Sequence, residues 1–288
     1  MVVGSANLDL VVTAPALPRP GETVLGGSFT TVPGGKGANQ AAAAALAGGR
    51  VGFIGAVGDD DFARPLRDNL VAAGVDVSRL RTVPGPSGVA LIAVDQHAEN
   101  LIVVAPGANT ALTDLTAEDR AAIAGAGVLL CQLEVPVETV AEAAAVARAN
   151  GTVVVLNAAP ARQLPAEVLS TVDVLVVNEG EAEVLAGRPA KPGDLLDLVP
   201  RVVLTLGARG AAYADRDGLR LDVAAPRVRA VDTTAAGDAF TGALAVAWAE
   251  GRPVEAAIRW ACAAGAVCAT RPGASSALPT RAEIEALS

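Results

Sequence analysis

The sequence predicts an α/β fold in which helices cover both faces of a mostly parallel central sheet. Two observations lead to this prediction. Short β-branched runs alternate with Ala-rich helical stretches, and the runs are almost continuously apolar, as strands buried on both faces should be. A third observation adds a small second sheet: two segments interrupt the alternation with Pro/Gly turns and strand-like patterns that have no helix between them.

The main sheet takes its predicted strands and helices from alternating segments. Strands are predicted for the runs VGFIGAVG, GVLLCQL, TVVVLNAAP, DVLVVN and RVVLTLG. Helices are predicted after the first four runs, in DDFARPLRDNLVAAG, PVETVAEAAAVARANG, PAEVLSTV and EGEAEVLAG. From AAGDAFTGALAVAWAEG onward the chain reads as mostly helical.

The two irregular segments, residues 10–33 and 87–104, read as hairpins of a small sheet. Because they are distant in sequence yet interrupt the same α/β pattern, we expect them to form one discontinuous lid beside the main domain. The 288 residues then form a single domain, residues 1–288, with these lid segments inserted in its core. At this length, and with 52% hydrophobic residues, a disordered or fibrous chain is excluded.

Charge and composition argue against two classes of partner. The chain has 31 acidic and 22 basic residues, a formal net charge of -9, and no run rich in Lys or Arg. Nucleic acids and anionic membranes attract the opposite sign of charge, so we expect neither as a partner. Aromatic residues make up 2% of the chain, which leaves little material for stacking on bases.

Histidine and cysteine usage restricts the chemistry further. The only histidine, His97, lies in the turn DQHAEN and is interpreted as exposed and structural. Cys131, Cys262 and Cys268 form no C-x-x-C pair and have apolar neighbours, which predicts buried thiols in a reducing compartment. No apolar run approaches the roughly 18 residues of a membrane span, and the first residues lack a basic secretory region, so we expect a cytoplasmic protein.

A glycine-rich segment, PGGKGANQAAAAALA, precedes an Ala-rich helix and is the first candidate ligand site. Glycines let the backbone approach a ligand closely, and the first turn of a helix offers free N–H groups. It is not a Walker A motif, because the spacing G-x-x-x-x-G-K is absent and Gly37 follows Lys36. The alternative is an ordinary glycine-rich turn between a strand and a helix.

The segment VDTTAAGDAFTGALAVAWAEG places small residues and an acid at the start of an amphipathic helix. The N–H groups of Ala236, Gly237 and Asp238 would form an anion cradle, and the helix dipole there favours developing negative charge. The alternative is that Asp238 only caps the helix. A carboxylate here could accept a proton from a hydroxyl while the amides hold a transferring phosphoryl group.

Polar residues recur where predicted strands end. Asn178 and Glu181, three residues apart at the change from strand to helix, suit Mg²⁺ held partly through water, or else form a solvated acidic first turn. The other positions are Asn7 and Asp9 in GSANLD, Glu134 in CQLEVP, Asn157 in LNAAPA and Thr205 to Gly210 in TLGARG. Singly each reads as a turn or cap residue, but together they mark the sheet edge where ligands bind.

The elements GSANLD, GGKGANQ, LNAAPA, NEGE, TLGARG and VDTTAAGDAF, in this order, resemble the PfkB carbohydrate kinase family, and within it the members that phosphorylate ribose. The resemblance runs essentially from end to end. It implies a three-layer α/β/α sandwich with a mostly parallel central sheet and a small β lid that closes over the sugar. The lid often pairs between subunits in this family, so a homodimer is expected.

The resemblance also implies roles for individual residues. Asp238 is expected to be the base that accepts the proton of the ribose 5-hydroxyl, with Gly237 and Ala236 at the transfer point. Sugar contacts are expected from Asn7, Leu8, Asp9, Gly35, Lys36, Gly37, Ala38, Asn39, Glu134 and Asp238. ATP contacts are expected from Asn178, Thr205, Leu206, Gly207, Ala208, Arg209, Gly210, Gly237, Asp238 and Cys262. Asn178 and Glu181 are expected to support Mg²⁺ through water.

A site for K⁺ is a further implication of the resemblance. Its ligands would be the Asp232 carboxylate and the carbonyl groups of Thr234, Cys268, Arg271 and Gly273, and the ion would help to fix the loop of the anion cradle.

Three departures from the family pattern stand out. Cys262 occupies a position that lines adenine and is often His. Ala277 replaces an often-used Ser in the cation loop, where Ser275 or Ser276 could substitute. The stretch from Arg188 to Pro200 is short, which predicts the loss of a surface helix.

The expected reaction is ATP-dependent phosphorylation of D-ribose at the 5-hydroxyl, which yields D-ribose 5-phosphate and ADP. Alternatives within the family act on deoxyribose, fructose or a nucleoside such as adenosine. An alternative of another class is a non-catalytic sugar or nucleotide sensor on the same fold. A Rossmann dehydrogenase is disfavoured, because no G-x-G-x-x-G follows the first strand.

Overall fold

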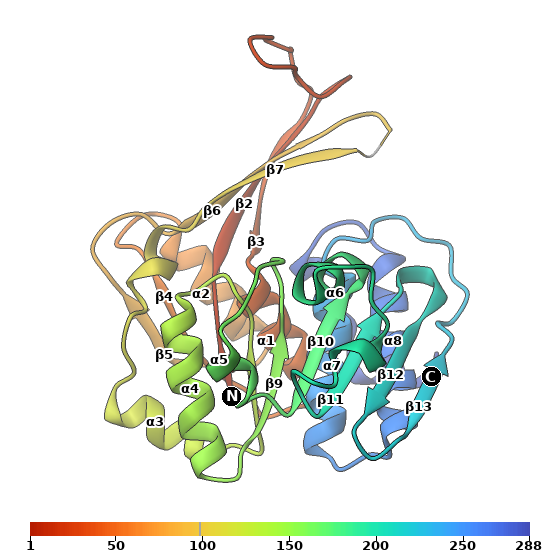
Figure 1. Ribbon diagram of the computed structural model, residues 1–288. Helices are drawn as coiled ribbons and strands as arrows, with labels where there is room; N and C mark the ends of the chain where they lie inside the picture. The colour runs from red at the N-terminus through yellow and green to blue at the C-terminus, as the bar shows by residue number, and fades with distance from the viewer. Residues whose placement is uncertain (98) are drawn as a thin grey trace.

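A large, mostly parallel sheet forms the centre of the computed structural model, which describes residues 1–97 and 99–288 (Figure 1). Over these residues nine strands follow the order β13-β12-β11-β10-β9-β8-β1-β4-β5. Only the pairs β11–β12 and β12–β13 are antiparallel. The strands are β1 (Val2–Val3), β4 (Gly52–Val57), β5 (Asp76–Thr82), β8 (Val128–Cys131), β9 (Val153–Asn157), β10 (Val174–Asn178), β11 (Arg201–Thr205), β12 (Ala211–Asp215) and β13 (Arg220–Val223).

Helices cover both faces of this sheet, so the predicted three-layer α/β/α sandwich is confirmed. Alternate strand residues point to opposite faces, and neighbours such as Val2 and Val3 belong to different core clusters. One face packs against α1 (Lys36–Leu46), α2 (Ala63–Ala72), α7 (Ala236–Ala249), α8 (Val254–Ala269) and α9 (Arg281–Glu285). The other packs against α3 (Ala117–Ala124), α4 (Val137–Ala149), α5 (Ala166–Leu169) and α6 (Glu179–Ala186).

A second, four-stranded sheet projects from the main body (Figure 1). Its order is β3-β2-β6-β7, with β2 (Asn7–Thr13), β3 (Phe29–Gly34), β6 (Gly88–Val94) and β7 (Asn100–Ala105). The strands come from the two segments in which hairpins were predicted, but β2 begins at Asn7, three residues before the expected boundary. Ala98, in the second predicted lid segment, lies outside the described residues.

The β2 strand pairs with β3 and β6 in the small sheet, and only three residues separate it from β1 in the large one. The start of β2 therefore lies at the junction of the two sheets. This connection places Asn7 and Asp9 beside the N-terminus of α1, because Asn7 pairs with Gly34 in β3 and α1 begins two residues later. The junction is where polar groups of the two sheets can meet.

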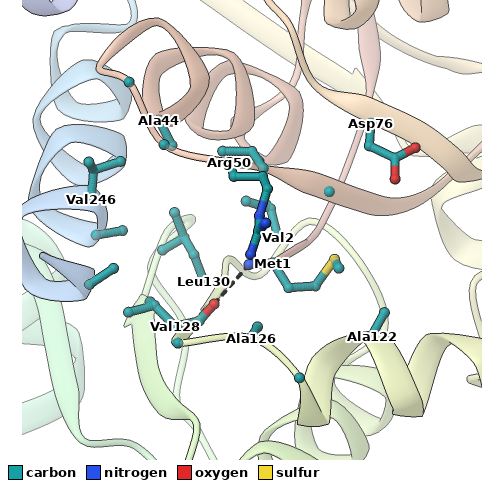
Figure 2. A pocket seen from close by; sticks show the side chains of 18 of the residues that line it. Met1, Val2, Ala44, Arg50, Asp76, Ala122, Ala126, Val128, Leu130 and Val246 are labelled. Atoms are coloured by element: carbon teal, nitrogen blue, oxygen red, sulfur yellow. Dashed lines mark hydrogen bonds between the residues drawn. The ribbon is translucent and has the colours of Figure 1, made fainter.

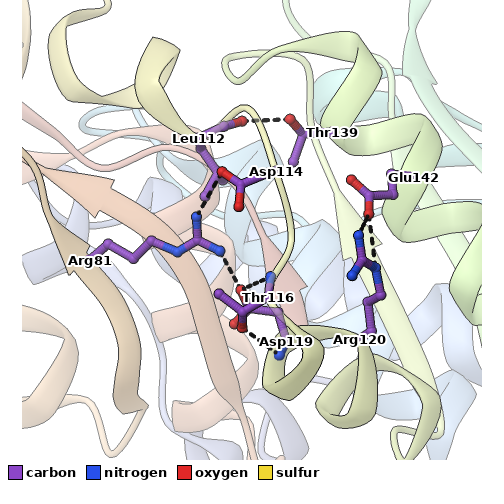
Figure 3. Close-up of polar contacts among 8 residues, drawn as sticks. All are labelled: Arg81, Leu112, Asp114, Thr116, Asp119, Arg120, Thr139 and Glu142. Carbon is purple, nitrogen blue, oxygen red and sulfur yellow. Dashed lines mark hydrogen bonds and ion pairs between the residues drawn. The ribbon is translucent and has the colours of Figure 1, made fainter.

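A set of polar contacts holds α3 against its neighbours (Figure 3). Arg81 of β5 forms ion pairs with Asp114, at 3.6 Å, and with Asp119. Asp119 also completes a capping box with Thr116 at the start of α3. On α4, the buried Thr139 hydroxyl donates to the Leu112 carbonyl. None of these residues lines the cavity described below, so they belong to the scaffold.

The stretch from Arg188 to Pro200, His97 and the cysteines agree with the sequence expectations. Between Arg188 and Pro200 the chain forms only the 3₁₀ turn Pro192–Leu195. His97 is exposed in the turn between β6 and β7, and all three cysteines are buried and unpaired. Within the described part of the chain, no helix is both long enough and apolar enough to cross a membrane.

Candidate active site

A polar cavity of about 220 Å³ lies at the carboxyl ends of the central strands, where open α/β sheets bind ligands. It brings together seven of the residues singled out in the sequence, from five separate segments of the chain. Its lining residues are Lys36, Asn157, Ala159, Val176, Asn178, Glu181, Thr205, Thr233, Ala235, Gly237, Asp238 and Thr241.

The segment before α7 forms the floor of an anion site. Ala235 has a φ of 58°, an unusual conformation for a residue with a Cβ, and it precedes the first helical residue. The Ala236 N–H already donates to the Thr233 carbonyl at 3.2 Å, so the predicted cradle is wrong in counting it as free. For the N–H groups of Gly237 and Asp238 no protein acceptor is present in the described residues. A Cβ added at Gly237 would meet nothing within 4 Å, which leaves open space for a ligand.

Asp238 is buried in the first turn of α7, with 9% of its surface exposed. Ala235 occupies the N-cap position, so the alternative in which Asp238 only caps this helix is wrong. Its carboxylate instead accepts hydrogen bonds from Asn39 Nδ2 at 3.1 Å and Gln40 Nε2 at 2.9 Å, both on α1. Burial raises the pKa of Asp238, while Lys36 and these two amides oppose the increase. A carboxylate of raised pKa is suited to accept a proton from a hydroxyl.

Two buried amides behind Asp238 were not identified from the sequence. Gln40 Nε2 also donates to Asn157 Oδ1 at 2.9 Å, and Gln132 Nε2 donates to Gln40 Oε1 at 2.6 Å. Both glutamine side chains are fully buried. The signal available was weak: Gln40 is the last residue of the motif GGKGANQ and Gln132 stands in the predicted strand run GVLLCQL, but neither was assigned a role.

Glu134, on the loop after β8, lies between the two sheets. Its Oε2 atom accepts from Ser5 Oγ at 2.6 Å, from the Lys36 N–H at 3.0 Å and from Asn7 Nδ2 at 3.4 Å. Asn7 Oδ1 in turn accepts from Asn109 Nδ2 at 2.7 Å. Ser5 and Asn109, both fully buried, are supporting residues that the sequence did not indicate. The arrangement fixes one oxygen of Glu134 and leaves the other for a ligand.

Asp9 completes the acidic set at the sheet junction. Burial, with Glu134 and Asp238 nearby, raises its pKa to about 7. Its carboxylate has no hydrogen-bond donor in the described part of the protein, and its Oδ2 lies 2.3 Å from where a Cβ on Gly34 would stand. A buried carboxylate without donors costs free energy, and the hydroxyl groups of a bound ligand would remove that cost.

The glycines of GGKGANQ serve the protein backbone as much as a ligand. Gly35 has a φ of 88°, and a Cβ there would lie 2.7 Å from the Asn7 nitrogen. A Cβ on Gly37 would lie 2.4 Å from the Ser5 nitrogen. These glycines let the N-terminus of α1 pack on the connection between β1 and β2. Leu8 and Ala38 are buried in the same core, so their side chains lie among apolar residues.

Asn178 and Glu181 form a capping box at the start of α6. Asn178 Oδ1 accepts from the Glu181 N–H, and Glu181 Oε2 accepts from the Asn178 N–H, both at 2.8 Å. Burial raises the pKa of Glu181, and Lys36 opposes that increase. The box holds oxygen atoms of both residues against the cavity that contains Asp238. Such a donor set fits a hydrated divalent cation such as Mg²⁺.

The predicted nucleotide residues lie on the next strand end. Thr205 lines the cavity, and Leu206 to Gly210 form an adjoining loop closed by the Leu206 N–H to Gly210 carbonyl bond at 2.8 Å. Arg209 of this loop pairs with Glu179 of α6 at 2.6 Å, and both side chains are largely exposed. Cys262 lies on α8 among residues of the hydrophobic core, and burial raises its thiol pKa to about 11. Its contact with ATP stays a prediction.

The residues of the predicted cation loop converge around one carboxylate. Asp232 accepts from the Thr234 N–H and the Gly273 N–H, each at 2.9 Å, and these bonds lower its pKa although burial opposes them. Cys268 Sγ donates to the Thr234 carbonyl at 3.6 Å, and the Arg271 N–H donates to the Cys268 carbonyl at 3.1 Å. An ionised carboxylate among backbone carbonyls offers the oxygen ligands that K⁺ takes in proteins.

Another cavity, of about 470 Å³, lies at the opposite edge of the sheet (Figure 2). Its lining includes the amino ends of β1, β4 and β8, where the Met1 amino group donates to the Val128 carbonyl at 2.8 Å. It contains none of the predicted site residues.

Within the described residues no group of three or more His, Cys, Asp or Glu side chains is placed to hold a metal ion.

Comparisons with known proteins agree with this geometry. The family model described as "pfkB family carbohydrate kinase" matches residues 1–281. A ribokinase of Bacillus subtilis is 41% identical over 289 residues, covering 99% of this chain and 98% of its own, and a deoxyribokinase of Salmonella typhimurium is 37% identical over 294 residues, covering 97% and 95%. The structure of an Arabidopsis thaliana ribokinase complexed with ribose and ATP superposes with a TM-score of 0.92 at 31% identity, covering 99% and 97% of the two chains. The chain therefore belongs to the pfkB family of carbohydrate kinases.

Proposed function

We propose that this kinase transfers the γ-phosphoryl group of ATP to the 5-hydroxyl of D-ribose and releases D-ribose 5-phosphate and ADP. The observation that carries the proposal is the position of Asp238. Its buried carboxylate lies between the acidic groups at the sheet junction and the free N–H groups that begin α7. A proton acceptor is thus placed next to an anion site.

The residues divide the work between the two substrates. Asp9, Asn7 and Glu134 offer carboxylate and amide groups to the sugar hydroxyls from the sheet junction. Asp238 accepts the proton of the attacking hydroxyl as the new O–P bond forms and the bond to the ADP oxygen breaks. The N–H groups of Gly237 and Asp238 then stabilise the charge on the transferring group, and Lys36 adds a positive charge from α1.

The nucleotide and its metal belong on the other side of Asp238. Thr205 and the loop to Gly210 accommodate ATP, and Asn178 with Glu181 hold Mg²⁺ through water. When bound, Mg²⁺ neutralises phosphate charge and orients the phosphates for transfer. K⁺ belongs beside Asp232, where the loop that it orders leads directly into the anion site.

The residues expected to face the sugar favour ribose over other sugars. The unpartnered carboxylate of Asp9 requires hydroxyl donors, and a sugar with fewer hydroxyls leaves it partly unpaired. The 37% identity to a deoxyribokinase makes 2-deoxyribose the second candidate substrate. A catalytically silent sensor has no use for a buried base, two free amides and a capped acidic pair in one cavity.

A homodimer that forms through the small sheet is also part of the proposal. The sheet exposes a group of large apolar side chains, each at least 44% exposed: Leu91, Leu101, Ile102, Val103 and Val104. Apolar patches of this kind mark interaction surfaces. The three buried free thiols suit a reducing cytoplasm.

The proposal is tested by ADP release from the purified protein with Mg-ATP and D-ribose, beside 2-deoxyribose, fructose and adenosine. Each substrate is measured with and without K⁺. Turnover that depends on ribose and increases with K⁺ supports the substrate and the cation site. Preference for another substrate would support a kinase with a different acceptor. No turnover with any of the four substrates would refute the kinase proposal and favour a non-catalytic sensor.

A further inference from the structure

A chain of buried side-chain amides runs from the core to the carboxylate of Asp238. Gln132 donates to Gln40 at 2.6 Å, and Gln40 donates to Asp238 Oδ1 at 2.9 Å. Asn39 donates to the other oxygen, Oδ2, at 3.1 Å. Gln40 and Gln132 are fully buried, and Gln132 is hydrogen-bonded to Gln40 and not to the carboxylate itself. Both carboxylate oxygens therefore receive an N–H from a side chain that the protein interior holds in place.

The direction of this chain follows from the charge of Asp238. An ionised carboxylate only accepts hydrogen bonds, so the NH₂ end of Gln40 must face it. The oxygen of Gln40 then points to Gln132, which can satisfy it only with its own NH₂ group. A rotation of either amide by 180° would place two acceptors or two donors face to face.

The orientation leaves amide oxygens without partners. Three buried side-chain N or O atoms have no hydrogen-bond partner in the described part of the chain, and two are Gln132 Oε1 and Asn39 Oδ1. An unpartnered buried polar atom lowers the stability of the fold. Both oxygens belong to amides whose NH₂ groups point along the chain toward Asp238. The amide orientation that directs N–H donors to the Asp238 carboxylate therefore lowers the stability of the fold.

We propose that Gln40, oriented by Gln132, is a positioning residue that fixes the rotamer of Asp238 and keeps its carboxylate ionised in the enzyme that binds substrate. This inference rests on the role of Asp238 as the base in the proposed function. Gln40 acts through Asp238 and not on the substrate. Its second bond, to Asn157 Oδ1 at 2.9 Å, links the carboxylate to the end of β9.

The charges around Asp238 explain why such donors are needed. Burial and neighbouring carboxylates favour the protonated acid, which cannot accept a proton. The titratable groups that face Asp238 come from five elements or their ends: Lys36 of α1, Asp9 of β2, Glu134 after β8, Glu181 of α6 and Cys268 of α8. Only Lys36 in this group carries a positive charge, so neutral N–H donors supply the remaining stabilisation of the anion.

The test compares Gln40→Met and Gln132→Met with the unmodified enzyme, because methionine has nearly the shape of glutamine without its polar ends. A hydrogen bond to a charged group contributes about 1.5–3 kcal/mol, so we expect Gln40→Met to lower kcat about 10- to 100-fold. The KM values for sugar and ATP should stay within about twofold. In the pH profile of kcat/KM, the acid limb should move to higher pH, because Asp238 loses a donor that lowers its pKa.

Gln132→Met is the sharper variant, since the Gln132 side chain is hydrogen-bonded to Gln40 and to neither Asp238 nor any residue assigned to the substrates. It should lower kcat by less than Gln40→Met does and should move the acid limb in the same direction, because without the bond from Gln132 the Gln40 amide can rotate away from Asp238. The matched control is Thr139→Val, which removes a buried hydrogen bond on α4. It should lower the melting temperature and leave the acid limb in place.

The results separate this inference from the proposed function. If both glutamine variants lose activity only in proportion to lost folded protein, with the acid limb unmoved, the positioning role is refuted. Should Gln40→Met fail to fold, Gln132→Met alone decides the matter by the same shift. A second readout, the ¹³C titration of the Asp238 carboxyl in the sugar-free protein, reports its pKa without turnover, whichever sugar the enzyme phosphorylates.

Discussion

Replacing Asp9 with asparagine should make the ligand-free protein more stable at neutral and alkaline pH. Burial raises the pKa of Asp9 from 3.8 to about 7 in the folded state, whereas the unfolded chain keeps the ordinary value. The folded protein therefore binds this proton more tightly than the unfolded chain does. Between about pH 4 and pH 7 the unfolded state releases the proton first, so stability falls as the pH rises through this window.

The size of the effect follows from the same values. The difference between 3.8 and about 7 corresponds to about 4 kcal/mol, at 1.36 kcal/mol per pH unit. The asparagine that replaces Asp9 buries an amide without assigned partners, which costs about 1–3 kcal/mol. We therefore expect Asp9→Asn to raise the free energy of unfolding at pH 8 by about 1–3 kcal/mol, and to change it little or lower it at pH 4.5.

Urea unfolding at pH 4.5, 6 and 8, followed by circular dichroism without ligand, measures this difference. Asp76→Asn is the matched control: Asp76 is exposed, and hydrogen bonds from Ser78 lower its pKa, so its removal should lower stability slightly at pH 8. The same Asp9→Asn protein should bind ribose more weakly, because it loses the acceptor for sugar hydroxyls. A stability difference between Asp9→Asn and the unmodified protein that does not change with pH would refute the reasoning.

Four further changes have expected outcomes. Asp238→Asn should fold and bind nucleotide but lower kcat about 10²- to 10⁴-fold in the ADP-release assay, and near-native turnover would remove Asp238 as the base. Lys36→Met should move the acid limb of the kcat/KM profile to higher pH, because Lys36 lowers the pKa of Asp238; an unmoved limb would contradict that coupling. Asp232→Ala should abolish the difference in turnover between K⁺ and a large organic cation. The substitution removes the carboxylate proposed to bind K⁺, which also holds the N–H groups of Thr234 and Gly273 in place. Ile102→Glu should yield a monomer in analytical ultracentrifugation, and a persistent dimer would place the interface elsewhere.

Much of the fold could be predicted from local patterns. The continuous apolar runs gave the parallel strands, since a strand buried on both faces has no polar alternation. The interruptions at residues 10–33 and 87–104 indicated the small sheet, because Pro/Gly turns and alternating residues disfavour a crossover helix. The boundary at residue 10 was late, because Asn7 and Asp9 were interpreted as polar residues at the end of a strand and not as part of a strand of the small sheet.

The site was predicted less completely, and for a physical reason. Asp238 and the glycines before α1 stand in motifs whose local conformation is special, so the sequence marks them. Gln40 and Gln132 lie 92 residues apart in ordinary surroundings, and their hydrogen bond exists only because α1 packs against β1, the strand that pairs with β8. The interpretation of Asp238 as only a helix cap was wrong because its partners are also distant in sequence. Ala235 takes the N-cap position, and side chains of α1 bind the carboxylate.

The sequence by itself therefore determined the layered α/β architecture, the family and the charged residues that lie at the carboxyl edge of the sheet. These properties depend on periodicity and local backbone preference, which neighbouring residues set. Only the tertiary structure decided which amides point at Asp238, which N–H groups remain free and why Asp9 holds its proton to about pH 7. Orientation, burial and pKa depend on groups that approach from distant parts of the chain, and no local pattern encodes that approach.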